Sequence, residues 1–420
     1  MAGAGSTLIG LKGTKYQLKS EKAKGGEGTV FVTDNPAVVV KVYHHPDAWT
    51  EKKLKCMVRH PLNPYADGVH LLIAWPLDVV YENGAFMGYV MPFVKDTYPI
   101  YVLCRNNESH THDCHEVFPN YNWTNSIAVA YHLAWAVNYV HQHGYIVGDM
   151  NSNNIMIHSD GSITILDVDS FDITDPETGE RFECTVGISE FLAPELQGRD
   201  LRKAKFTKHT DEFALAVHIF QLLMGNAHPF NVKVVDSVKQ SLPENKLEMN
   251  IVNGNCPWVK AINGITIPPG APQITMLPAK IQTAFRQVFG YNAVNAASSG
   301  PQRVSADMWR QLLYMFYQRA ARQGGDLVQC QTNPEHFYLK ARGCEFCRAK
   351  QRYERFLAQL SAEQSKAKGT AAPGSSGKSG GSGNTGSSVK SGSSNQQAAV
   401  AQTAASGANR KRPWWMRLFF

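Results

Sequence analysis

Short runs of apolar and β-branched residues, separated by glycine and charged positions, fill most of the first ninety residues of the chain. Runs of this length and composition, bounded by turn residues, predict β-strands. The predicted strands cover residues 16–23, 29–33, 38–42, 71–76 and 84–93. The chain is therefore expected to begin with a strand-rich lobe.

The pattern changes to helical spacing after residue 120. Apolar and aromatic positions recur three to four residues apart at Ile127, Tyr131, Ala134, Val137 and His141. We expect this helix to begin at Thr124 or Asn125 and to end at Gly144. A second apolar helix is expected after Asp211, whose carboxylate would cap the free amides of its own helix. Amphipathic patterns predict further helices beyond Trp309 and over residues 348–362.

A predicted hairpin lies beside a cluster of polar residues. Its strands, residues 155–157 and 163–166, flank the turn at Asp160 and are preceded by Asp149 and Asn154. Asp167 follows directly, thirteen positions after Asn154, and this is the spacing of a phosphoryl-transfer loop. There a carboxylate at Asp149 would orient or deprotonate a hydroxyl, and Asn154 and Asp167 would hold Mg²⁺. Taken alone, the motif also fits a surface hairpin.

The first lobe supplies candidates for a nucleotide site. Gly25, Gly26 and Gly28 lie between two predicted strands, where backbone amides can approach phosphate oxygens. Val30 would then cover the adenine. Lys41 lies in an apolar strand thirteen residues past Gly28, and pairing with phosphate would explain a lysine there.

Two further assignments complete this site. Glu51 is chosen as the helical partner of Lys41, partly by elimination, because few acids lie nearby. The last strand ends at Met91, Pro92 and Phe93. Proline cannot donate a hydrogen bond, so Phe93 or Val94 is expected to supply the backbone donor to the adenine.

The composition of the chain excludes several classes of protein. With 420 residues and 43% hydrophobic content, it has room for two or three domains. It lacks an apolar run of membrane-spanning length and a signal-peptide pattern, so we expect a cytoplasmic protein. Eight of its 42 basic residues follow Glu363, after which there is no acid. The preceding part is nearly neutral, with 34 basic and 35 acidic residues, and does not suggest nucleic-acid binding.

Four metal-binding side chains lie close together near residue 340. Cys330, His336, Cys344 and Cys347 offer nitrogen and sulfur ligands within eighteen residues, and end in a C-x-x-C pair. Structural zinc takes four such ligands in a closed tetrahedron. We therefore predict one structural Zn²⁺, although three buried cysteines with an unrelated histidine would give the same pattern. The Cys- and His-rich segment at 104–115 matches no metal pattern and is expected to be a solvated loop.

The end of the chain differs from the rest in composition. Residues 366–409 are mostly Gly, Ser, Ala, Asn and Gln, which cannot bury a core, so we expect a disordered linker. Residues 410–420 combine four cations with two Trp and two Phe. A segment so short cannot bury these rings by itself. We expect it to dock on a partner protein or on this chain, in preference to a membrane surface.

With these motifs in view, residues 14–320 resemble the eukaryotic-type protein kinase family. More narrowly, the chain resembles bacterial kinase-like proteins with a C-terminal zinc ribbon, which occur with tellurium-resistance and with von Willebrand A or phosphatase partners. The phrases that carry this narrower resemblance are residues 74–77, 148–151 and 167–171. The resemblance implies an α+β, bilobal fold that binds ATP and Mg²⁺.

The resemblance also implies roles for individual residues. Asp149 would be the catalytic base, Lys41 and Glu51 an ion pair, and Glu195 the partner of Arg303 in the helical lobe. The implied division places the nucleotide lobe at 12–93, the helical lobe at 94–322 and the zinc module at 323–362. The linker then covers 363–409 and the tail 410–420.

Several positions depart from the family pattern. The expected residues are replaced at Ala23, Val147, Gly148, Asn151, Asp169 and Ile188. Our main hypothesis is a Ser/Thr protein kinase acting in signalling or a stress response. The departures favour the alternative of a pseudokinase scaffold that binds ATP and acts by contact. A small-molecule phosphotransferase is a distant third, because residues 193–195 and Asp211 suit a protein substrate.

Overall fold

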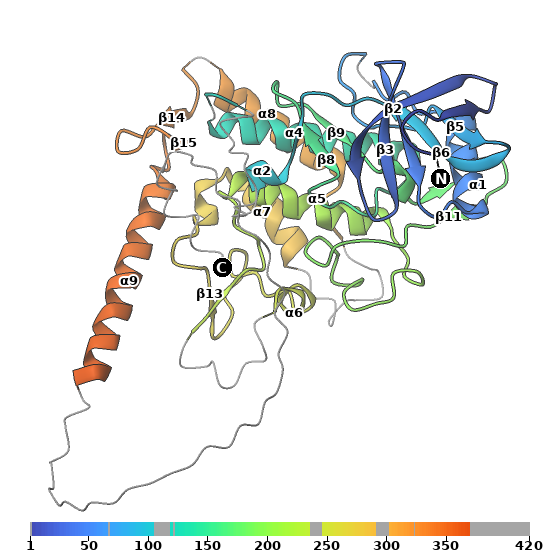
Figure 1. Ribbon diagram of the computed structural model, residues 1–420. Coiled ribbons are helices and arrows are strands. Elements are labelled where there is room, and N and C mark those ends of the chain that lie inside the picture. Colours follow the sequence, from blue (N-terminus) through green and yellow to red (C-terminus); the bar gives the residue numbers. More distant parts are fainter. Residues whose placement is uncertain are drawn as a thin grey trace, which may run out of the picture. The chain divides into compact units, whose positions relative to one another are not determined.

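A computed structural model describes residues 2–65, 68–104, 118–120, 122–235, 246–290, 302–322 and 324–369. The chain divides into two compact units, residues 1–349 and 350–420, which are treated separately below. The first unit contains a strand-rich N-terminal lobe and a helical C-terminal lobe (Figure 1).

The N-terminal lobe is a closed barrel of six strands in the order β1-β2-β3-β4-β6-β5. Its strands are β1 (Thr7–Gly10), β2 (Lys15–Lys24), β3 (Gly28–Thr33), β4 (Val38–Tyr43), β5 (Asp78–Glu82) and β6 (Ala85–Pro92). Every residue of β4 is buried, which explains why four of its six residues are valine. Helix α1 (Ala48–Arg59) follows β4 and packs against β5 and β6.

One predicted strand is wrong. Residues 71–76 form no strand, although Ile73 makes a single parallel bridge to Ile165. Two backbone hydrogen bonds join the segment to Ile165, whereas the amide of Leu72 donates to the carbonyl oxygen of Pro64 and not to a strand. The strand that pairs with β6 in this region begins at Asp78, after Pro76.

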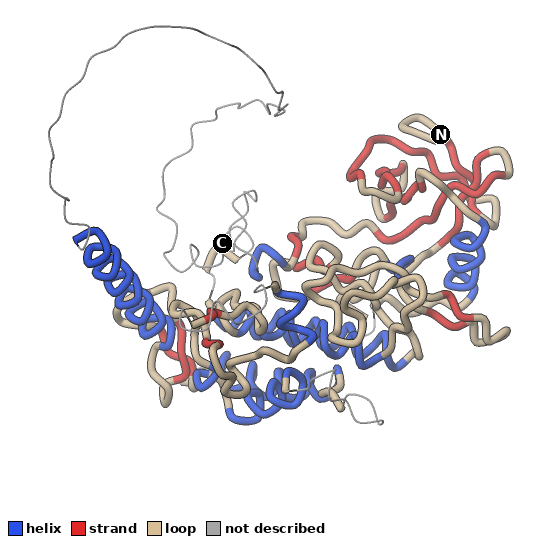
Figure 2. The backbone as a smooth tube through the Cα atoms, turned by 90° about the horizontal axis from the view of Figure 1, so that it is seen from below, coloured by secondary structure: helices blue, strands red, loops and turns tan. Residues whose placement is uncertain are grey.

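Most helices of the first unit lie in the C-terminal lobe, and the strands of the barrel gather at the other end (Figure 2). Helix α4 (Trp123–Gln142) packs against α5 (Lys208–Leu223) and α8 (Ala306–Ala321). The other helices are α2 (Tyr101–Cys104), α6 (Leu247–Val252) and α7 (Ala279–Phe289), with 3₁₀ turns η1 (Val168–Ser170) and η3 (Ile274–Met276). The nearly complete burial of α5 explains its apolar sequence.

The expected hairpin is present in this lobe. Strands β8 (Ile155–Ile157) and β9 (Ile163–Ile165) pair around the turn, and β7 (Tyr98–Pro99) adds a third strand. Two-stranded pairs join β10 (Ile173–Thr174) to β11 (Arg181–Phe182), and β12 (Lys233–Val234) to β13 (Ile265–Thr266).

Several helix starts differ from the prediction, and α8 begins at Ala306, before Trp309. Helix α4 begins at Trp123 because the side chain of Asn122 accepts a hydrogen bond from the amide of Thr124. In α5 the capping residue is Thr207 and not Asp211. The carboxylate of Asp211 turns to a different segment, described below.

The first unit ends with a hairpin of β14 (Leu327–Gln329) and β15 (Phe337–Leu339). Helix α9 (Glu345–Gly369) follows and is longer at both ends than the predicted 348–362. The first residues assigned to the linker are therefore helical. The rest of the linker, the tail at 410–420 and most of the Cys- and His-rich segment lie outside the described residues. None of the described helices combines the length and hydropathy needed to cross a bilayer.

Candidate active site

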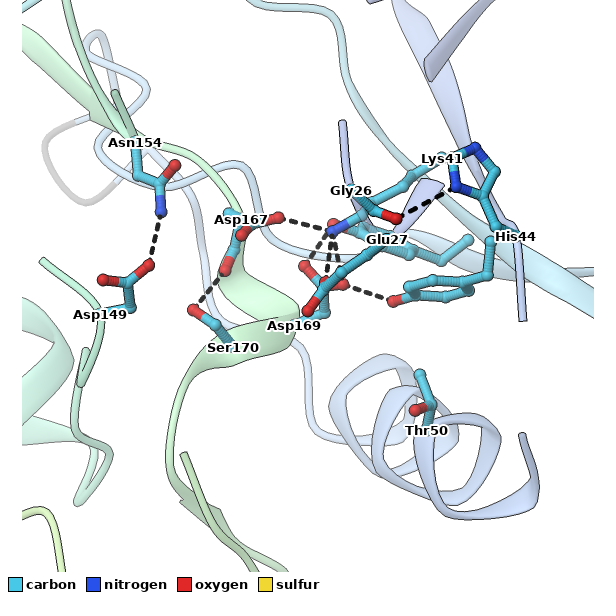
Figure 3. A network of polar contacts seen from close by, with 12 residues as sticks. Gly26, Glu27, Lys41, His44, Thr50, Asp149, Asn154, Asp167, Asp169 and Ser170 are labelled. Carbon is cyan, nitrogen blue, oxygen red and sulfur yellow. Dashed lines mark hydrogen bonds and ion pairs between the residues drawn. The ribbon is translucent and has the colours of Figure 1, made fainter. Parts of the chain in front are cut away.

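Asp149 lies in the loop between α4 and β8, together with two amides. Its Oδ2 accepts a hydrogen bond from Asn151 Nδ2 at 2.6 Å. It accepts a second from Asn154 Nδ2 at 3.4 Å (Figure 3). Its Oδ1 is buried and has no hydrogen-bond partner among the described residues. Burial raises the pKa of Asp149, against the effect of the Asn151 bond. One carboxylate oxygen is thus held, and the other is left to accept a proton.

Asp211 fixes the start of this loop. Its carboxylate accepts the amides of Val147 at 2.7 Å and Gly148 at 2.9 Å, and lies 2.9 Å from His141 Nε2. Asp211 is fully buried, so these donors are what make its burial tolerable. A side chain predicted to cap its own helix instead holds the catalytic loop.

Steric constraints explain why a glycine, Gly148, directly precedes Asp149. Gly148 has φ +74°, and a Cβ there would lie 2.5 Å from Cys184 Sγ. Helix α5 also holds the loop, because His218 Nε2 lies 2.7 Å from the carbonyl oxygen of Met150. We did not predict Cys184 or His218, since neither has a local sequence signal that connects it to this loop.

Asp167 follows β9 and is brought to the same region. It has a left-handed backbone with φ 55°, and its carbonyl accepts a hydrogen bond from Ser170 Oγ at 2.8 Å. The amide of Leu166 donates to the carbonyl of Asn154 at 2.7 Å and so ties the two candidate metal ligands together. Burial and the charge of Asp169 raise the pKa of Asp167 to about 6.

Lys41 extends from β4 to the same acids. Its Nζ lies 2.5 Å from Asp167 Oδ1, 2.8 Å from Asp169 Oδ2 and 3.6 Å from Glu27 Oε2. Burial disfavours the ammonium, but Asp169 and Asp167 outweigh it, and the pKa of Lys41 is raised. The strand beside it must approach closely, because a Cβ on Gly88 would lie 1.9 Å from the Lys41 carbonyl oxygen.

The predicted pair between Lys41 and Glu51 is wrong. Glu51 accepts hydrogen bonds from Lys55 Nζ at 2.5 Å and Tyr81 OH at 2.8 Å. Helix α1 instead buries Lys53, whose Nζ donates to the carbonyl oxygen of Asp169 at 2.6 Å. Lys53 shares the buried face of the helix with Met57, four residues on. That spacing was the available signal, and choosing an acid by elimination overlooked it.

The glycine turn lies where it was expected, between β2 and β3. The amide of Gly25 donates to the carbonyl of Gly28 at 2.9 Å, and a Cβ on Gly28 would lie 2.6 Å from the Val42 carbonyl oxygen. His44 Nδ1 lies 3.1 Å from the Gly26 carbonyl oxygen. Val30 is half-buried on β3. Glu27, which we did not single out, is the acid that this turn brings toward Lys41.

At the exit of the barrel, the structure decides between two predicted donors. The amide of Phe93 donates to the Ala37 carbonyl oxygen at 2.8 Å. It is therefore occupied, and Val94 is the remaining candidate to supply a backbone donor to an adenine. Met91 is buried in β6, next to this exit.

The expected ion pair of the helical lobe is present. Arg303 donates to both carboxylate oxygens of Glu195, at 2.6 and 2.7 Å, and to the His209 carbonyl at 2.7 Å. Such a two-pronged contact is the strong form of an arginine–carboxylate pair. It ties the loop after Ala193 and Pro194 to the segment that leads into α8.

The four predicted zinc ligands converge within 4.8 Å of one another. Cys330 Sγ is 3.6 Å from Cys347 Sγ, and His336 Nδ1 is 3.6 Å from Cys344 Sγ and 3.4 Å from Cys347 Sγ. A tetrahedral zinc with ordinary bond lengths gives edges of about 3.8 Å between sulfurs and about 3.6 Å from sulfur to nitrogen. The residues therefore fit a zinc ion.

Comparison with known proteins agrees with this geometry. Residues 95–275 match the model of the protein kinase domain. The chain is also 30% identical, over 341 residues, to "Protein kinase YegI" of Escherichia coli O157:H7 and 29% identical to that of strain K12. The chain therefore contains a segment that matches the protein kinase domain, and its similarity to bacterial protein kinases extends over most of its length. A weaker match, 27% over 129 residues, is to "cAMP-dependent protein kinase, catalytic subunit-like" of Caenorhabditis elegans, covering 30% of each chain.

The resemblance to the bacterial kinases extends beyond the matched kinase domain. It covers 79% of this chain but only 48% of those relatives, so the chain spans about half their length. The barrel that carries Lys41 lies before residue 95, outside the part that matches the kinase-domain model. The geometry around Lys41 and the longer match to the bacterial kinases together support including the barrel in the kinase fold.

Proposed function

We propose that this chain transfers the γ-phosphoryl group of Mg²⁺-ATP to a Ser or Thr hydroxyl of a protein. The observation that carries the proposal is the meeting of Asp149, Asn154, Asp167 and Lys41 at one place (Figure 3). Asp149, Asn154 and Asp167 come from one segment of the helical lobe, and Lys41 comes from the barrel. Their convergence supports phosphoryl transfer more strongly than any of the motifs does alone.

Each residue has a distinct task in this proposal. Asn154 and Asp167 would hold Mg²⁺, which when bound offsets charge on the phosphates. Asp149 orients the acceptor hydroxyl and accepts its proton at Oδ1, the oxygen that is not hydrogen-bonded in the described structure. Lys41 places its positive charge next to the phosphates, and its contact with Asp167 weakens as it does so. The glycine turn brings backbone amides close to the same phosphates.

A protein substrate is favoured over a small molecule by the surface beside Asp149. The segment after Cys184, which contacts Gly148, exposes the apolar side chains of Val186 and Ile188 to 38% and 41%. The Glu195–Arg303 pair anchors the other end of this segment. An anchored, partly apolar surface beside the base suits an extended peptide, whereas a drug-sized acceptor would not require it.

The decisive experiment compares phosphoryl transfer and nucleotide binding. Asp149→Asn is expected to lower transfer from radiolabelled ATP at least about 100-fold, because the general base is lost. It should keep nucleotide-dependent thermal stabilisation, since Asp149 does not contact Lys41. Asp160→Asn, a matched change in the hairpin turn, should leave transfer unchanged.

Two results would contradict this assignment. Unchanged transfer in Asp149→Asn would remove Asp149 from the mechanism. ATP-dependent stabilisation of the unaltered chain without transfer to itself or to any protein tested would support the scaffold alternative. Replacement of the usual residues at Val147 and Asn151 is the observation that keeps this alternative in view.

We also propose that Cys330, His336, Cys344 and Cys347 bind one structural zinc ion. The fit of their separations to a tetrahedral site supports this assignment. The four protein ligands would close the coordination shell, which favours a structural role over a catalytic one.

A further inference from the structure

Asp169 is the most completely enclosed of the three acids that contact Lys41 in the described structure. Its Oδ2 accepts hydrogen bonds from Lys41 Nζ at 2.8 Å and Tyr43 OH at 2.5 Å, and its Oδ1 accepts one from Tyr89 OH at 3.0 Å. Only 4% of its side chain is exposed. The donors lie on two neighbouring strands, β4 and β6, so the barrel itself holds this carboxylate.

The backbone of Asp169 is held as well. Lys53 Nζ, from α1, donates to its carbonyl oxygen at 2.6 Å. The buried site therefore contains two ammonium groups, Lys41 and Lys53, and two carboxylates, Asp167 and Asp169. Burial of charge at this density is tolerable only when the charges are paired and hydrogen-bonded. Lys41 is paired with Asp167 and Asp169, and Lys53 donates to a backbone carbonyl oxygen.

We propose that Asp169 is the positioning residue for Lys41, performing the task for which Glu51 was expected. This inference rests on the proposed function, because it assumes that Lys41 contacts the nucleotide phosphates. A long lysine side chain has many rotamers, so an acid must hold its ammonium in place for binding. The position of the carboxylate is set by η1 and the two tyrosines, and not by an acid on α1.

Asp169 suits this task better than Asp167 does. Asp167 is 34% exposed on its side chain and is a candidate Mg²⁺ ligand, so its contact with Lys41 would weaken when a metal is bound. Asp169 keeps three side-chain donors that do not depend on the metal. It can therefore hold Lys41 in both states of the site.

This arrangement changes what helix α1 can do to the position of Lys41. This helix contributes a cation, Lys53, to the backbone of Asp169, while its acid Glu51 is engaged by Lys55 and Tyr81. Loss of an α1 carboxylate would not release Lys41. The arrangement predicts that Lys41 stays positioned as long as the barrel and η1 remain in contact.

The test is a double-mutant cycle on nucleotide affinity, measured with a fluorescent ATP analogue and Mg²⁺. Asp169→Asn is expected to weaken binding about tenfold, a size that couplings between adjacent groups reach. The same change in the Lys41→Met background should alter affinity less than twofold, because there is no ammonium left to position. Glu51→Gln, the matched acid-to-amide change on α1, should alter affinity less than twofold.

The outcomes separate a positioning role from a structural one. Equal effects of Asp169→Asn with and without Lys41 would overturn the inference, as would a tenfold loss in Glu51→Gln. If Asp169→Asn does not fold, Tyr89→Phe removes one donor to Asp169 and leaves all charges, and its smaller loss should again require Lys41. Absence of nucleotide binding in the unaltered chain would overturn the proposed function and this inference together.

Discussion

At the scale of single residues, Gly148 shows how closely the catalytic loop is packed. An alanine there would meet two costs, a left-handed backbone and a Cβ that lies 2.5 Å from Cys184 Sγ and 2.8 Å from Cys184 Cβ. We expect Gly148→Ala to lower the free energy of unfolding by about 2–4 kcal/mol. Chemical denaturation followed by circular dichroism would measure this loss.

Gly144→Ala is the matched control for this prediction. Gly144 also has a left-handed backbone, with φ +80°, but a Cβ there would meet nothing within 4 Å. Gly144→Ala should lower the free energy of unfolding only by the backbone strain, about 1 kcal/mol. The difference between the two losses in free energy of unfolding measures the effect of the contact with Cys184. Equal losses would show that this contact is not tight.

Residue assignments made from sequence succeeded where the residues share one short segment. The meeting of Asp149, Asn154 and Asp167 could be expected because a loop and a tight hairpin leave few ways to arrange them. The partner of Lys41 could not be found in this way. Its choice depends on which face of α1 turns inward and on a carboxylate 128 positions away in the sequence. The four-residue spacing of Lys53 and Met57 indicates the inward face of α1, but local spacing does not encode the distant carboxylate.

At the scale of elements, the zinc module is joined to the helical lobe by the residues between its last two cysteines. The ring of Phe346 lies 6.5 Å from that of Trp123 in α4, and an added Cβ on Gly225 would meet it at 2.9 Å. The carboxylate of Glu345 accepts the amide of Gln273 at 3.0 Å. The cysteines that flank these residues thus place them against the lobe.

Cys347→Ser is therefore expected to lose zinc and to lower the melting temperature, while keeping nucleotide binding. Metal bonds replace a hydrophobic core in so small a module, so losing one ligand removes most of its stability. Elemental analysis should find one zinc per unaltered chain, and much less after the substitution or after treatment with a chelator. Cys256→Ser, at a buried cysteine outside the cluster, should keep its zinc. Freshly purified protein without zinc would end the assignment.

Elements were predictable where their hydrophobic period was regular. The strands on both sides of the glycine turn and the hairpin before Asp167 lie close to their expected positions. The error at 71–76 has a physical origin, since an apolar run can be buried as an extended connector without a strand to pair along its length. Helix α9 was placed too short because its polar end has no hydrophobic period.

At the scale of the whole molecule, the described fold does not explain the basic aromatic tail at 410–420. We propose that this segment docks on a partner, because its two Trp and two Phe follow a long stretch without bulky residues. Deleting it should leave phosphorylation of a free peptide unchanged but reduce capture of a partner protein. Pull-down and liposome flotation would measure this, with a deletion of equal length in the linker as the control. A truncated chain equal to the full one in both assays would contradict docking.

The connector at 71–76 has a mechanical consequence. The amide of Ala74 donates to the Ile165 carbonyl, and the amide of Ile165 donates to the Leu72 carbonyl, each at 2.9 Å. Ile165 lies two residues before Asp167, so the chain that leads back into the barrel is hydrogen-bonded directly to the strand that precedes this candidate metal ligand. A rotation of the lobes that passed through this point would have to break both bonds. A thermal rotation of the two lobes should therefore bend the chain at other points. Asp167 would move together with the connector as one rigid piece.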